Sequence, residues 1–342
     1  MKKAIFSASV LALATLVASC SKETNEPSIM PMEDYAELKL DFPGVTVPTK
    51  VPLVADEISA EASVYDIQVL VFNENGLELA QKINGTTGSL KVTKGSKTVV
   101  AVANYSNDLS GCESPEDVYE TATSLDDNTI GSTPYFVMSG ETDVTVEGTT
   151  QASITLERIA AKFLIRDINL ELNSAFSASD ISIDRIYLDN VVVNATLGGE
   201  KAPLSTLDFV NERGGFDDNA NYQPWTSGYY DNWTMDEDVY STKLYAYPNI
   251  TEDEDDDRDK TGAFTVRKTR IVVEATLKGK KTFYPFTFSG PIERNHYYEI
   301  TDLVITGYGV EHPEDPTPTK GDFTVNVIVK PWEQGGSTSI EI

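Results

Sequence analysis

Apolar and polar residues alternate with a period of two along most of the chain, which is the pattern of strands with one buried face. In the first half, turn-forming residues such as Asn75-Gly76 separate these segments. The strands expected there are 36–42, 67–72, 90–92, 98–103, 144–146 and 154–156. The segment 98–103 is almost entirely apolar, which is typical of a central strand covered on both faces.

The second half continues in the same style. The strands expected there are 160–170, 181–188, 243–247, 269–277, 283–288, 297–305 and 323–330, and most are rich in Val, Ile, Thr or aromatic residues. Only 115–124 and, as a further option, 204–211 could form a helix. Short strands joined by turns favour sandwiches over α/β folds, so we predict an all-β fold with few short helices.

Two long irregular stretches interrupt the second half. The first, 214–236, carries the aromatic residues Trp225, Tyr229, Tyr230 and Trp233. These rings could stack on sugars as a binding site, or they could cover the sandwich edge or line a subunit contact. The second stretch contains six consecutive acidic residues, 252–257, without the spaced pattern of a calcium loop, so we expect a solvated loop there.

The N-terminus predicts export. Lys2 and Lys3 precede an uncharged run from Ala4 to Ser19, so we expect a signal peptide over 1–19. The residues up to Cys20 resemble the lipobox of bacterial lipoproteins, which implies lipidation of Cys20. The alternatives are an ordinary signal peptide or a transmembrane anchor, although this run is shorter than the roughly 20 residues that a spanning helix needs. Residues 20–35 are expected to form a flexible tether.

Charge and residue usage narrow the chemistry. The net charge of −27 disfavours nucleic acid as a partner, and membrane contact is expected only through the lipid on Cys20. With that cysteine lipidated, only Cys112 remains, so no intramolecular disulfide, metal site or cofactor is expected. A serine triad needs a histidine, but His296 lies in an expected strand and His312 precedes a proline. We therefore predict a protein that is not an enzyme. Its length favours two domains.

A set of short motifs gives the chain a family resemblance. They are IQVLVFN (67–73), KGSKTVVAVAN (94–104), ITLERIAAKFLI (154–165), YAYPN (245–249), RNHYY (294–298) and VIVKPWE (327–333). Each motif is weak by itself, but the ordered set after a lipobox resembles the fimbrillins of Bacteroidales. It covers most of the chain after the signal peptide.

The resemblance implies two tandem transthyretin-like β-sandwich domains, which we place at 36–156 and 157–342. It implies a structural subunit of cell-surface fimbriae that supports adhesion. Such subunits cross the envelope as outer-membrane lipoproteins, and an outer-membrane protease then removes the first strand together with the lipid. The opened groove accepts a C-terminal strand of the next subunit in the extracellular fimbrium. The implied partners are therefore that protease and other fimbrial subunits.

The sequence offers a candidate for each part of this mechanism. The segment 36–42, with Leu38, Leu40 and Phe42 on one face, is either the removable strand or simply a permanent first strand. In the proline-flanked loop after it, Lys50 is the candidate cut site. The best-known family members are cut after arginine, whereas this chain has no arginine before Arg158.

The expected donor strand is 323–330, with Phe323, Val325, Val327 and Val329 on one face. It could instead be a final strand that stays in its own domain. Residues 337–342 form a second short alternating segment. The alternative function is a fimbrial tip adhesin, or a carbohydrate-binding surface lipoprotein that does not polymerise.

Overall fold

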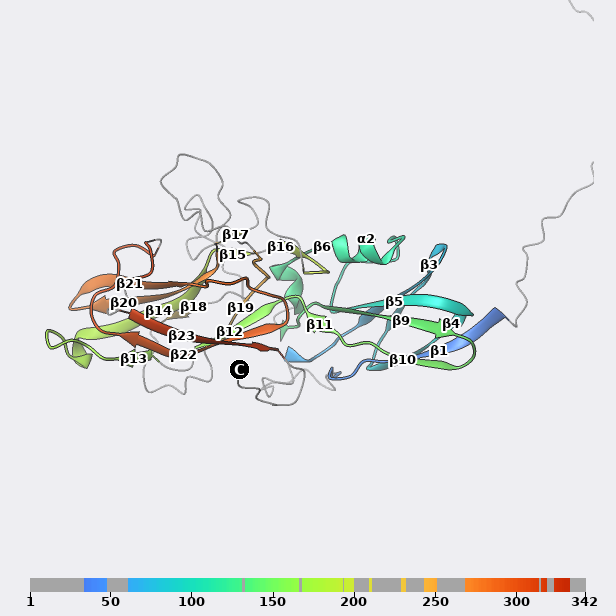
Figure 1. Ribbon diagram of the computed structural model, residues 1–342, viewed down its shortest axis with the longest axis horizontal. Helices are drawn as coiled ribbons and strands as arrows, with labels where there is room; N and C mark the ends of the chain where they lie inside the picture. Colours follow the sequence, from blue (N-terminus) through green and yellow to red (C-terminus); the bar gives the residue numbers. More distant parts are fainter. Residues whose placement is uncertain are drawn as a thin grey trace, which may run out of the picture. The chain divides into compact units, whose positions relative to one another are not determined.

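The computed structural model describes residues 34–47, 61–130, 133–165, 168–192, 194–199, 209–210, 229–231, 243–250, 268–313, 315–318 and 323–332. Residues from Tyr35 onward form one compact unit. The described part of this unit is built of β-strands, with one short helix, α2 (Pro115–Glu120), and two 3-10 turns, η2 (Leu125–Asn128) and η3 (Ala178–Asp180) (Figure 1). The predicted all-β fold class is confirmed.

The helix α2 begins where the sequence provides a cap. Ser114 Oγ accepts a hydrogen bond from the backbone N–H of Asp117, and the Asp117 carboxylate accepts one from the backbone N–H of Ser114. The helix is shorter than the predicted range 115–124, because the chain continues as strand β6 (Ala122–Ser124). Within the described residues, no helix combines the length and the apolar character that crossing a bilayer requires.

Two sheets arise from the first half of the chain. In the smaller one, β1 (Tyr35–Asp41) lies between β4 (Thr87–Thr93) and β10 (Thr150–Ser153). The larger sheet has the order β11 (Glu157–Arg158), β9 (Met138–Val146), β5 (Gly95–Ala103), β2 (Ile67–Asn73) and β3 (Gly76–Ile83). Residues 99–103 of β5 are all buried, as predicted for a central strand.

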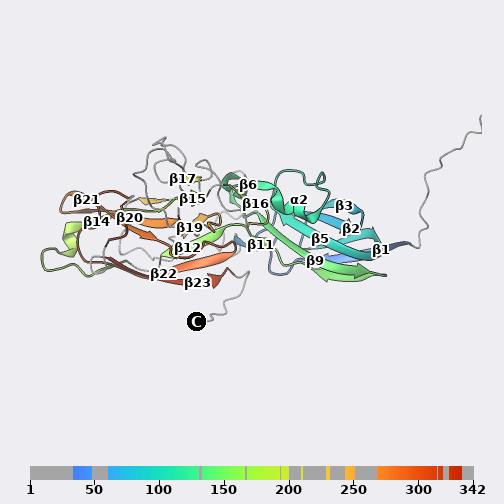
Figure 2. The same cartoon turned by 45° about the horizontal axis from the view of Figure 1, so that its top comes forward.

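Two further sheets arise from the second half (Figure 2). In one, β12 (Ala161–Ile165) and β13 (Ile168–Leu170) pair with β22 (His296–Ile305), β19 (Lys243–Ala246) pairs with β12, and β23 (Phe323–Pro331) pairs with β22. The other has the order β18 (Tyr229–Asp231), β14 (Ile181–Asp189), β20 (Arg270–Leu277) and β21 (Lys280–Thr287).

Three short strand pairs complete the described fold. They are β7 (Thr129–Ile130) with β8 (Thr133–Pro134), β15 (Val191–Val192) with β17 (Phe209–Val210), and β16 (Asn194–Thr196) with β6. Residues 209–210 form the strand β17, so the helix that was predicted as a further option over 204–211 is wrong at these two residues.

Among the described strands, the pair of β11 and β9 and the pair of β16 and β6 join residues on the two sides of position 156. In addition, one cluster of buried apolar residues extends from Leu38 to Trp332. The division into two domains at residues 156 and 157 therefore stays a prediction.

Candidate strand-exchange site

The strand β1 is buried on one face only. The side chains of Leu38 and Leu40 are 0% and 2% exposed and belong to the main core, and Phe42 just after the strand is also buried. Glu37 and Lys39, on the two sides of Leu38 in sequence, are exposed. The predicted apolar face of this segment is confirmed, and backbone pairing and this face hold β1 in place.

Both backbone edges of β1 are used. Tyr35–Asp41 pairs antiparallel with β4 along its whole length, and Leu38–Asp41 pairs parallel with β10. Neither β4 nor β10 pairs with another described strand. On the exposed face of this strand pair, Ser89 Oγ donates a 2.8 Å hydrogen bond to Glu37, which lowers the pKa of this carboxyl. Without β1, this sheet would lose all of its interstrand pairing.

The chain after β1 makes a tight turn and returns to the core. Gly44 has a φ of 79°, a conformation that favours glycine. The backbone N–H of Thr46 then donates to Ala62 O at 3.0 Å, and the N–H of Val64 donates to Thr46 O at 2.8 Å. Residue 46 and residues 62–64, on the two sides of the segment 48–60 in sequence, therefore lie side by side. Lys50 lies in this segment, outside the described residues, as does Cys20.

The strand β23 lies at the edge of its sheet and pairs only with β22 among the described strands (Figure 2). Phe323 is buried, and Val325 and Val327 are half-buried, in agreement with the predicted alternation. Val329 departs from it, because it is 47% exposed and its neighbour Ile328 is 42% exposed. The C-terminal part of β23 therefore contributes less buried apolar area than its first part.

Directly after β23, Trp332 enters a buried socket. Its ring stacks on Tyr245 at a centroid distance of 5.8 Å and meets Phe136 edge-on at 5.0 Å. The guanidinium of Arg158 lies 4.4 Å from the ring centroid, and Arg158 Nη1 donates to Trp332 O at 3.0 Å. Trp332 Nε1 donates to the Glu61 carboxylate at 3.1 Å.

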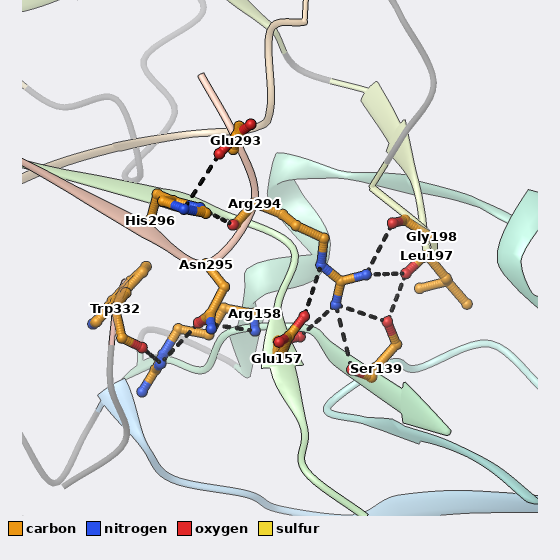
Figure 3. Close-up of polar contacts among 10 residues, drawn as sticks. All are labelled: Ser139, Glu157, Arg158, Leu197, Gly198, Glu293, Arg294, Asn295, His296 and Trp332. Atoms are coloured by element: carbon orange, nitrogen blue, oxygen red, sulfur yellow. Dashed lines mark hydrogen bonds and ion pairs between the residues drawn. The ribbon is translucent and has the colours of Figure 1, made fainter. Parts of the chain in front are cut away.

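Glu61 and Arg158 are the charged groups that define this socket. The Glu61 carboxylate accepts hydrogen bonds from Lys162 Nζ at 2.7 Å and from the Tyr245 hydroxyl at 2.8 Å. Arg158 Nε donates to Glu61 O at 2.9 Å. Figure 3 shows the bond that Arg158 Nη1 donates to Asn295 Oδ1 at 3.2 Å. Burial lowers the pKa of Arg158 to about 10, while the charge of Glu61 acts in the opposite direction, so Arg158 stays charged at neutral pH.

Arg294 makes a second junction. In Figure 3 its guanidinium lies to the right of Arg158, whereas Trp332 lies to the left. Its guanidinium donates to Gly198 O at 2.9 Å, to Ser139 Oγ at 3.0 Å and to Glu157 O at 2.8 Å. These bonds tie a turn of the second half to β9 and β11. The neighbouring His296 is half-buried at the start of β22, where its Nδ1 lies 2.8 Å from Arg294 O.

The structure describes part of the predicted aromatic site. The backbone of Tyr229 and Tyr230 forms β18 and pairs with Tyr187 and Ile186 of β14, so these two residues extend a sheet. Trp225, Trp233 and the acidic run 252–257 lie outside the described residues. A sugar-stacking role for these four aromatic residues stays a prediction.

Comparisons with known proteins support the observed fold. Residues 36–170 match the family model of the major fimbrial subunit protein FimA. The major fimbrium subunit FimC of Porphyromonas gingivalis is 30% identical over 207 residues, a match that covers 58% of this chain and 39% of FimC. The chain thus spans about two fifths of the length of the curated relatives it matches.

Solved structures show the same fold at low sequence identity. A putative cell adhesion protein from Parabacteroides distasonis is 17% identical with a TM-score of 0.62, over 89% of this chain and 100% of that chain. A fimbrilin (FimA) from Porphyromonas gingivalis is 14% identical with a TM-score of 0.57, over 88% and 99%. The family match over residues 36–170, the FimC relative and the fimbrilin structure together confirm the resemblance of this chain to the Bacteroidales fimbrillins.

Proposed function

We propose that this protein is a structural subunit of a cell-surface fimbrium that supports adhesion, and that it polymerises by strand exchange. One observation carries the proposal. The strand β1 joins β4 and β10 into a sheet that has no other described strand, and before the candidate cut segment Thr46 bonds to residues 62 and 64, which follow that segment. A cut in this segment would separate β1 covalently and leave the rest of the fold connected.

The energetics favour exchange after such a cut. In the intact chain β1 is tethered to its groove, whereas after the cut it can dissociate. The backbone groups of β4 and β10 that faced β1 then lose their partners, and each one that stays shielded from water costs about 1–3 kcal/mol. An incoming strand would satisfy these groups, and its alternate side chains would fill the positions of Leu38 and Leu40.

The remaining parts of the proposal follow the family resemblance. The precursor is a surface-exposed outer-membrane lipoprotein, anchored through Cys20, and a protease cuts it at Lys50. The donor is β23, presented by the next subunit in a homo- or heteropolymer. The FimC relative and the family match to FimA support this role. The energy for polymerisation then comes from proteolysis.

Peptide binding tests the donor and acceptor roles together. A fluorescent peptide of residues 323–332 is expected to bind the chain only after the cut and the release of β1, as measured by anisotropy. A matched peptide with Val325→Asp and Val327→Asp is expected not to bind, because both positions face the buried residues Leu303 and Ile300 in β22 and would face the core of the groove. Equal binding to cut and uncut chain, or none to either, would contradict the proposal.

A further inference from the structure

The end of β23 and the residue that follows the candidate cut segment meet inside the chain. Trp332 Nε1 donates to the carboxylate of Glu61, and Arg158 bonds the backbone oxygens of both residues. Glu61 is 7%, Arg158 1% and Trp332 5% exposed, so water competes little for these bonds. The position of the C-terminal strand therefore depends on where the backbone at residue 61 lies.

That backbone position depends in turn on β1. Thr46 follows β1 and pairs with the segment 62–64, next to Glu61, through two backbone hydrogen bonds. A β1 that leaves after a cut at Lys50 takes Thr46 with it. Ala62 O and Val64 N then lose these partners, and the backbone that carries Glu61 loses its neighbour.

Apart from its backbone pairing with β22, the strand β23 is held by Val325 and Val327, which pack against the core, and by an ion pair of 3.0 Å between Lys330 Nζ and the Glu299 carboxylate. It is an edge strand, and Ile328 and Val329 near its end are 42% and 47% exposed. Phe323 packs at its start, with its ring 5.7 Å from that of Tyr284. At its other end the anchor is Trp332, and weakening the Trp332 socket should let β23 peel from β22, beginning at Pro331.

We infer that Glu61, Arg158 and Trp332 form a clasp that keeps β23 on its own chain while β1 is in place, and that the departure of β1 opens it. This inference rests on the proposed function, because it concerns the release of the donor strand. When β1 leaves, the clasp opens, so the acceptor groove and the donor strand of one subunit become available together. A precursor that retains β1 is thereby blocked at both ends, and only cut subunits can join.

Hydrogen exchange of the full chain tests the clasp. In the uncut chain, Glu61→Gln removes the charge of the acceptor, and Trp332→Phe removes the donor but keeps an aromatic ring. Each is expected to speed amide exchange in β23 about ten- to a hundredfold, since a hydrogen bond to a charged group is lost. Glu157→Gln is the matched control, because Glu157 is adjacent to Arg158 in sequence but its carboxylate lies beside Arg294, outside the Trp332 socket, and is 54% exposed. It should leave β23 unchanged.

Two further measurements make the test specific. The double variant should exchange no faster than the faster single variant, because both substitutions act on the same bond. Exchange in the buried strands β2 and β5 should stay slow in all variants, which shows that the fold is kept. In the wild-type chain, the cut and the release of β1 should speed exchange in β23 at least tenfold.

The outcomes separate the clasp from the proposed function. Unchanged β23 exchange in both single variants, equal acceleration by Glu157→Gln, or a β23 that stays protected after β1 has left would each overturn the clasp. Filaments that form from cut chain without a prior loosening of β23 would refute the clasp alone. A loosened β23 in cut chain that never polymerises would refute the proposed function alone.

Discussion

A disulfide between positions 39 and 89 is expected to abolish polymerisation of the cut chain, and reduction is expected to restore it. Lys39 of β1 lies opposite Ser89 of β4, and both side chains are exposed. Directly opposed residues of antiparallel strands lie about 4.5–5.5 Å apart at their Cα atoms, within the range that a disulfide spans. The variant Lys39→Cys with Ser89→Cys therefore locks β1 in its groove without altering the core.

The assay follows filaments by electron microscopy and SDS-resistant ladders on gels, with and without reductant. The matched control joins Thr98 of β5 to Asp143 of β9, an opposed pair in the other sheet of the same half. That disulfide leaves β1 free and should leave polymerisation intact. Burial raises the pKa of the native Cys112 thiol, which makes it a poor competitor for the new cysteines. Polymerisation of the oxidised 39–89 variant would show that β1 need not leave.

The largest expected loss of stability comes from Arg158→Ala. This side chain is buried and bonds Glu61 O, Asn295 Oδ1 and Trp332 O, so its removal leaves several buried acceptors without their donor. It also removes the cation above the Trp332 ring. We expect the free energy of unfolding to fall by about 3–5 kcal/mol, the usual cost of removing one member of a buried charged cluster.

Urea unfolding of the uncut chain measures this loss. Lys94→Ala, which removes an exposed cation from the bend between β4 and β5, is the control and should change stability by no more than about 0.5 kcal/mol. Arg158→Lys keeps the charge but lacks the planar fork, so it should recover only part of the loss. A loss below about 1 kcal/mol for Arg158→Ala would show that the socket contributes little to the fold.

The strands that the sequence predicted well are those whose alternation is directly visible. The segments 36–42 and 323–330 correspond to β1 (Tyr35–Asp41) and β23 (Phe323–Pro331) within one residue at each end. By contrast, β3 (Gly76–Ile83) and the first part of β9 (Met138–Val146) were not predicted. Both contain Glu or other weak strand formers, and they are strands because they pair with the apolar strands β2 and β5.

The Trp332 socket could not be predicted from local patterns. Trp332 was visible in the sequence as an aromatic residue directly after a strand, but its partner Glu61 lies 271 residues away and has no distinctive neighbours. Arg158 was noted only as the first arginine of the chain. Its burial against Trp332 follows from the packing of β11 near the end of β23, which strand alternation does not encode. The exposure of Val329 also escaped prediction, because alternation does not reveal whether a strand lies at an edge.

The most direct test of strand exchange is to treat the purified full chain with limiting trypsin and to follow it by N-terminal sequencing, gel electrophoresis and electron microscopy. The account predicts a new N-terminus within 48–60, most specifically after Lys50, together with SDS-resistant ladders and filaments. A chain that is cut in this segment but remains a monomer, with β23 still protected, would contradict the account.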